Sequence, residues 1–149
     1  MKSRVIRAEA HATIRRPCAV VFGWLTDPSL LPRWVTGLVE SRPEGTAEVR
    51  LGARSVEEVS LRGRTMTMIA EIVELEPSHV VASRIETPDG PLLSRFVLDD
   101  IGEACSLAHT LTAEFSGHRW IPSGFLAASM SRQIRRDLDR LTQLAEGNQ

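Results

Sequence analysis

Among the residues whose side chains could do chemistry, His109 has the most distinctive setting. It lies in the alternating stretch from Ser106 to Phe115, in one row with Leu107 and Leu111, so its imidazole is expected on an apolar face. A histidine in that position could hydrogen-bond a ligand carbonyl or hydroxyl, or transfer a proton near neutral pH. The alternative, which we favour, is a core histidine satisfied by a neighbouring hydroxyl or backbone group.

Asp137 is the second candidate for catalysis. It lies at the edge of the apolar arc of the helical pattern over residues 123–146. A partly buried carboxylate needs a partner, because its pKa otherwise rises. It could pair with His109, with an arginine or with a ligand group. We favour a side chain that leans outward to Arg136 or Arg140.

Other patterns of reactive residues find little support in the sequence. The four histidines are scattered and have no metal-ligand spacing, so no metal site is predicted: they are His11, His79, His109 and His118. We find neither a G-x-S-x-G motif nor a glycine-rich phosphate loop, and we expect no cofactor. The formal charge of −1 argues against a nucleic-acid partner, which normally requires a basic face.

The two cysteines and the N-terminus bear on the cellular compartment. Cys18 and Cys105 are far apart and belong to no Cys-x-x-Cys or other ligand spacing. Residues 1–7 carry charges and no signal-peptide-like apolar run. No stretch approaches the ~20 apolar residues of a membrane-spanning helix. These features predict a reducing, cytoplasmic setting.

The N-terminal third predicts one strand and two short helices. Alternation from Ile6 to Ile14 is typical of a strand with one buried side. Pro17 suits the first position of a helix, and apolar residues then recur at helical spacing as far as Leu25. Asp27, followed by proline, is expected to cap a second short helix that ends near Trp34.

The remainder predicts a meander of antiparallel strands and a closing helix. Turn signals after Gly37 separate short alternating segments at intervals of roughly 8–14 residues. An amphipathic pattern then runs from about Ser123 to Glu146, with an apolar arc on one side. Packed on the concave face of a twisted sheet, this helix would complete the core. Residues 1–149 are therefore expected to form a single α+β domain of about seven strands.

An apolar cavity between sheet and helix is a further expectation. Small alanines in the first strand face flexible methionine side chains, which can change rotamer to accommodate a bound ligand. Alternatively, bulky neighbouring side chains could fill this space. Trp34 and Trp120 could rim the mouth or plug the ends of the core. Arg84 could form an ion pair with a ligand carboxylate inside the cavity, but we favour a solvent-facing side chain. The residues expected to contact a ligand are Trp34, Met66, Met68, Phe96, His109, Leu111, Trp120, Met130 and Ile134.

Several motifs, taken in order, resemble those of a known superfamily. Residues 21–28 and 31–34 are similar to the helix-pair signature of the START-like, or SRPBCC, superfamily, and in particular of its polyketide cyclase/dehydrase-type branch. Further similar segments are residues 52–54, residues 71–77, Gly117 and the helix end at residues 138–141. The resemblance implies a helix-grip fold. It also implies a cavity for lipids, sterols, polyketides, quinones or other apolar molecules.

Three functions follow from these observations as hypotheses. The leading one is a module that binds one small apolar or amphipathic molecule, with His109 as an orienting polar contact. The alternative is a cyclase, aromatase or dehydratase that uses His109, alone or together with Asp137. A third is a protein-binding role like that of chaperone-activator relatives, which predicts an exposed apolar patch. A homodimer is left open.

Overall fold

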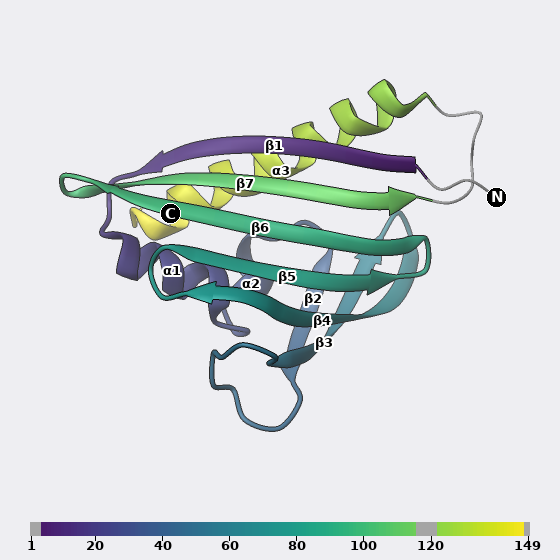
Figure 1. The fold of residues 1–149 in the computed structure, drawn as a ribbon, viewed down its shortest axis with the longest axis horizontal. Coiled ribbons are helices and arrows are strands. Elements are labelled where there is room, and N and C mark those ends of the chain that lie inside the picture. The colour runs from purple at the N-terminus through teal and green to yellow at the C-terminus, as the bar shows by residue number, and fades with distance from the viewer. Residues whose placement is uncertain (1–3, 116–121, 148–149) are drawn as a thin grey trace.

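A curved antiparallel sheet and one long helix make up most of the computed structural model, which describes residues 4–115 and 122–147 (Figure 1). The strands are β1 (Arg4–Ile14), β2 (Leu38–Pro43), β3 (Arg54–Leu61), β4 (Arg64–Glu76), β5 (Val80–Thr87), β6 (Gly90–Ile101) and β7 (Ala104–Phe115). The helices are α1 (Cys18–Thr26), α2 (Leu31–Trp34) and α3 (Ser123–Ala145). This is the α+β helix-grip fold that the sequence predicts.

The seven strands follow the order β1-β7-β6-β5-β4-β3-β2, and every neighbouring pair is antiparallel. Strands β2 to β7 form a meander, and β1 adds to its far edge by pairing with β7 from Arg4 to Ile14. Register shifts occur at residues 38–40 in β2 and 72–74 in β4. Such irregularities bend a strand, so they help the sheet to curve.

The expected turn signals lie where the chain reverses. Arg62 and Gly63 join β3 to β4 with φ of 52° and 78°. Two successive positive φ angles are typical of a type I′ hairpin turn, which matches the twist of the flanking strands. Gly102 reverses the chain between β6 and β7 with φ of 74°.

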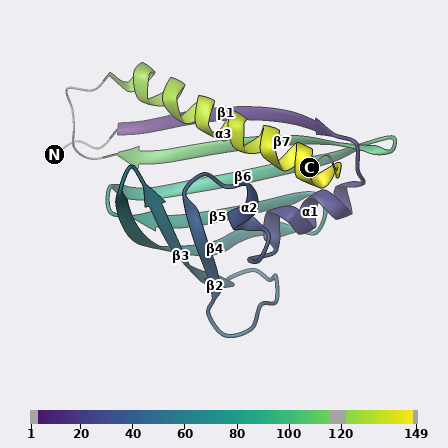
Figure 2. The ribbon, with the colours of Figure 1, turned by 180° about the vertical axis from the view of Figure 1, so that it is seen from behind.

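Helix α3 crosses the concave face of the sheet over β1 and β7, with α1 and α2 near its C-terminal end (Figure 2). Its buried residues include Ile134, Leu138 and Leu141. They join the same core cluster as Ala8 and Ala10 of β1. The small alanines let the helix approach β1 closely, so this part of the interior is packed and the expected gap opposite the alanines does not form there.

The second short helix begins later than the sequence suggests. Asp27 is the C-cap of α1, and α2 begins at Leu31. The Asp27 Oδ1 atom accepts hydrogen bonds from the Ser29 backbone N–H at 2.9 Å and from the Ser29 hydroxyl at 2.7 Å. Asp27 therefore stabilises a turn between the helices rather than capping α2, because its short side chain bonds to backbone two residues ahead.

Cys18 and Cys105 form a disulfide that joins the start of α1 to the start of β7, with a Cα–Cα distance of 5.0 Å. Both cysteines are buried. Disulfides persist mainly in oxidising compartments. The sequence analysis did not predict this bond, and the cytoplasmic setting stays a prediction. Within residues 4–115 and 122–147, no helix has the length and apolar character needed to cross a membrane.

Candidate functional site

A cavity of about 270 Å³ lies between the concave face of the sheet, α2 and α3. Its volume is near the lower end of the range for small-molecule pockets, about 300–1,000 Å³. Six residues that the sequence analysis expects at a ligand site line it: Trp34, Met68, Phe96, His109, Leu111 and Ile134. None of the described β1 residues lines it. The open space therefore lies against the concave face of the middle strands and not against β1.

Met66 and Met130, two of the other residues expected at the site, do not line this cavity. Met66 is half-buried, pairs with Val59 in the β3–β4 register and is not among the described lining residues. Met130 packs against the main core cluster rather than along the cavity. Trp120 lies outside the described residues. Arg84 donates to Glu86 at 3.0 Å on the exposed side of β5, so the favoured solvent-facing interpretation is confirmed.

His109 is held by its neighbours on β6. Its Nε2 atom lies 2.8 Å from the Ser94 hydroxyl, and its ring stacks on Phe96 with centroids 3.9 Å apart. Burial lowers the pKa of His109 to about 4, so the imidazole is neutral at pH 7. Its Nδ1 atom is buried and has no hydrogen-bond partner among the described residues.

The favoured interpretation of His109, a core histidine bonded to a hydroxyl, therefore describes only one of its two ring nitrogens. The hydroxyl is that of Ser94. The second nitrogen keeps an unused hydrogen-bonding capacity, which is costly in the interior. A neutral imidazole can donate through one nitrogen and accept through the other. His109 is thus suited to orient a polar group of a bound molecule.

Asp137 connects α3 to the segment after α2. It is 5% exposed, and its carboxylate accepts hydrogen bonds from the Thr36 hydroxyl and, at 3.2 Å, from the Thr36 N–H. Arg140 lies 3.6 Å from it and also donates to the Trp34 carbonyl at 2.8 Å. The expected outward orientation is wrong, because the carboxylate is buried, but the expected Arg140 contact is present.

Opposing effects act on the Asp137 carboxyl group. Burial raises its pKa, whereas the Thr36 hydrogen bonds and the charges of Arg140 and Arg136 lower it. The described partners of Asp137 do not include His109. The two candidate catalytic residues therefore do not form a hydrogen-bonded pair.

Trp34 forms a wall of the cavity. It is 3% exposed, its Nε1 atom donates to the Trp24 carbonyl at 3.0 Å, and its ring meets Phe96 edge-on at 6.1 Å. Because its N–H is already bonded within the fold, the indole contributes apolar surface to the cavity. It packs into the core and does not stand free at a mouth.

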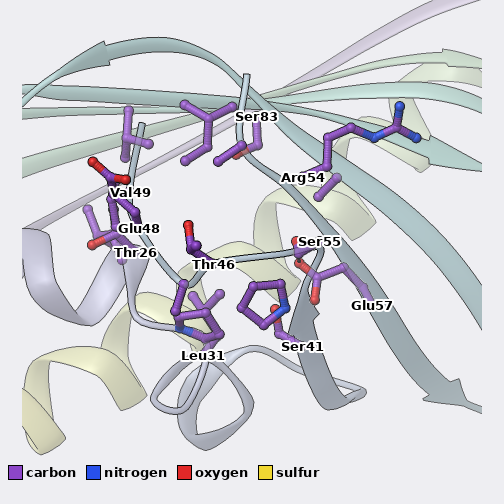
Figure 3. Close-up of a pocket in the computed structure, with 18 residues that line it drawn as sticks. Thr26, Leu31, Ser41, Thr46, Glu48, Val49, Arg54, Ser55, Glu57 and Ser83 are labelled. Atoms are coloured by element: carbon purple, nitrogen blue, oxygen red, sulfur yellow. Dashed lines mark hydrogen bonds between the residues drawn. The ribbon is translucent and has the colours of Figure 1, made fainter. Parts of the chain in front are cut away.

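The sequence analysis did not identify Glu57 as a site residue. Glu57 lines the large cavity and also a neighbouring one of about 90 Å³, which Figure 3 shows. Both faces of the segment from Arg54 to Leu61 carry polar residues, so alternation does not indicate which one is buried. The sequence does offer one signal for Glu57, the apolar Val59 two residues further along the strand. Val59 lies on the same face of the strand as Glu57 and is buried in the structure.

Metal ligation finds no support in the described ranges, residues 4–115 and 122–147. They contain no group of three or more His, Cys, Asp and Glu side chains that could hold an ion. The polar groups that line the cavity are hydroxyls, carboxyls, the Gln133 side chain and one imidazole. They can form hydrogen bonds to an organic molecule.

A curved sheet gripping a C-terminal helix around an apolar cavity defines the START-like, or SRPBCC, class of protein. Residues 5–146 match the family model described as "Polyketide cyclase / dehydrase and lipid transport", and the chain belongs to this family. The match covers all strands from β2 to β7 and most of the remaining structure. No curated protein matches the sequence.

Solved structures with the same fold come from varied sources. A protein of unknown function from Staphylococcus aureus has a TM-score of 0.81 at 12% identity, over 98% of this chain and 96% of that one. Ara h 8.0201 has a TM-score of 0.74 at 13% identity, with coverage of 97% and 100%. The di-domain ARO/CYC StfQ of the steffimycin biosynthetic pathway has a TM-score of 0.78 at 14% identity, over 96% of this chain and 51% of that one. At these identities the similarity shows the fold alone.

Proposed function

We propose that this protein binds one small apolar or amphipathic molecule in the cavity between the sheet and α3. The observation that carries the proposal is the 270 Å³ cavity itself, which is lined mainly by apolar side chains together with a buried, neutral His109. Interiors are normally close-packed, so a void of this size needs an explanation. The lipid-transport description of the family is consistent with it.

Affinity and orientation would come from different groups. Burial of apolar ligand surface contributes about 25 cal/mol per Å², before the costs of association. Trp34, Phe96 and Leu111 provide such surface. A polar group of the ligand would bond to His109, whose Nδ1 atom lacks a partner among the described residues. The bound molecule would thereby be held in one orientation.

A cyclase or dehydratase activity receives less support from the geometry. Such chemistry needs at least two polar groups that converge on the substrate. Both Asp137 oxygens accept from Thr36, and Arg140 lies beside them. His109 with a pKa near 4 is also a weak base at neutral pH. The geometry of the site therefore favours ligand binding over catalysis by His109 and Asp137.

Co-purification tests the proposal directly. The protein would be purified under native conditions, extracted with organic solvent and analysed by mass spectrometry for bound small molecules. The stripped protein would then be titrated with the neutral fluorescent probe N-phenyl-1-naphthylamine. We expect saturable probe binding with a stoichiometry of one, and an extracted organic molecule would identify a natural ligand. A stripped protein that shows no saturable binding would contradict the proposal.

A further inference from the structure

The smaller cavity contains a cluster of polar side chains from β2 and β3. Ser41 and Glu57 are directly opposite in the β2–β3 register, and the Ser55 hydroxyl donates to Glu57 Oε1 at 3.1 Å. Glu57 Oε2 and the Ser41 hydroxyl are buried and form no hydrogen bond of normal geometry with the described residues, although the Ser41 hydroxyl lies close enough to Glu57 to oppose the rise of its pKa. Figure 3 shows Ser41, Ser55 and Glu57 on one side of the pocket. The fold therefore leaves bonding capacity unused here.

No described cation neutralises Glu57. Arg42 forms ion pairs with Glu40 and Glu58, and Arg54 lies 3.6 Å from Glu44. In Figure 3 the Arg54 side chain extends away from the centre of the pocket. Burial raises the pKa of Glu57, and the nearby Ser41 and Ser55 hydroxyls only partly oppose this. Glu57 therefore retains the capacity to bond to one more polar group.

The two cavities adjoin each other. They share five lining residues: Leu25, Leu31, Glu57, Ala70 and Ser83. Ser83 is directly opposite Ser94 in the β5–β6 register, and Ser94 bonds to His109. Polar groups are therefore present at His109 on β7, at Ser83 on β5 between the two ends, and at Glu57 on β3. The two ends are four strands apart in the sheet, about 19 Å along its surface at the usual strand spacing.

We propose that one elongated, neutral molecule occupies both cavities, with a hydroxyl group at the end that bonds to Glu57 and Ser41. The inference rests on the proposed binding function and names its ligand class: an apolar body with an alcohol or phenol group at the Glu57 end and a second polar group near His109. A hydroxyl can donate to a carboxylate or accept from a protonated carboxyl, and it can do either with serine. A ligand carboxylate would be repelled by Glu57, and an ammonium would lose more hydration on burial.

Matched probes separate this inference from simple apolar binding. Dissociation constants of 1-octanol and 1,8-octanediol would be measured by displacement of N-phenyl-1-naphthylamine. The ratio of the two constants cancels the contribution of the shared apolar body. In Glu57→Leu we expect the preference for the diol to fall about fivefold, the usual effect of one hydrogen bond. Glu57→Gln keeps a donor and an acceptor and should retain most of the preference.

Glu58→Gln is the matched control, because Glu58 bonds to Arg42 and Thr67 rather than lining either cavity. It should leave the ratio unchanged. Ser41→Ala gives a second, conservative test at the same subsite and should also reduce the preference for the diol. An unchanged ratio in Glu57→Leu and Ser41→Ala, with normal probe binding, overturns this inference and leaves the proposed function standing. Failure of the wild-type protein to bind the probe overturns both.

Discussion

Phe96 and His109 stack face to face, with ring centroids 3.9 Å apart and ring planes inclined by 11°. The two residues are directly opposite in the β6–β7 register, so the pairing of the strands itself brings the rings together. The stack covers one face of the imidazole and removes it from water. This burial is the reason that His109 remains neutral at physiological pH.

The neutral His109 should make the protein sensitive to acid. Its pKa is about 4 in the fold, below its ordinary value of 6.5, so it contributes stability above pH 6.5 that is lost as the pH falls towards 4. The full loss corresponds to about 3 kcal/mol. In His109→Asn, the free energy of unfolding should fall less steeply over this range. Urea denaturation at a series of pH values measures the difference.

His11 supplies the control for this measurement. Its side chain is 71% exposed on β1. The variant His11→Asn makes the same substitution at an exposed position and is the matched comparison for His109→Asn. If His109→Asn and the wild type showed parallel curves between pH 7 and pH 4, the burial argument for His109 would be wrong.

Filling the cavity should weaken ligand binding. Ser83 lines both cavities, so Ser83→Phe would place an aromatic ring in the space proposed for the ligand. We expect affinity for N-phenyl-1-naphthylamine to fall at least about tenfold. The free energy of unfolding should fall by about 1–3 kcal/mol, because the larger side chain crowds its neighbours. Fluorescence titration gives the affinity, and thermal melting gives the stability.

Arg84→Phe adds the same ring at the next position, on the exposed side of β5. It should bind the probe with wild-type affinity, because successive residues of a strand lie on opposite faces. Equal affinities for the Ser83 and Arg84 variants would show that the probe binds elsewhere on the protein.

Asp137 is predicted to stabilise the fold. Asp137→Ala removes the acceptor of the Thr36 N–H and leaves Arg140 without its nearby carboxylate. We expect a loss of about 1–3 kcal/mol in the free energy of unfolding, the usual result of leaving a buried donor unpaired. The exposed Asp139 on the same helix provides the comparison, and Asp139→Ala should change stability by less than about 0.5 kcal/mol. Similar losses in both variants would refute this role.

The disulfide should add stability that a reducing agent removes. Cys18 and Cys105 are 87 positions apart, so their bond restricts a long loop of the unfolded chain. Reduction should lower the free energy of unfolding by about 2–4 kcal/mol. The double variant Cys18→Ala/Cys105→Ala should be insensitive to reductant. Thiol alkylation followed by intact-mass analysis checks the bond itself, and two labelled thiols in the unreduced protein would exclude it.

The elements of this fold follow from local patterns in the sequence. Alternation from Ile6 to Ile14 predicts β1, and the apolar arc through Ile134 and Leu141 predicts the buried face of α3. These predictions are confirmed because strand and helix periodicities are properties of the backbone that a few neighbouring residues express. His109 was also identified in this way, since its strand alternates clearly.

The contacts of the candidate site were decided by the tertiary structure. Thr36 and Asp137 are 101 positions apart, and Cys18 and Cys105 are 87 positions apart, so no local pattern indicates that they meet. Glu57 lies in a strand with polar residues on both faces, and only the curvature and register of the sheet turn its carboxyl group inward. The sequence by itself determined which segments are strands and helices. The closure of the sheet around α3 decided which polar groups lie together, because that depends on pairings between distant parts of the chain.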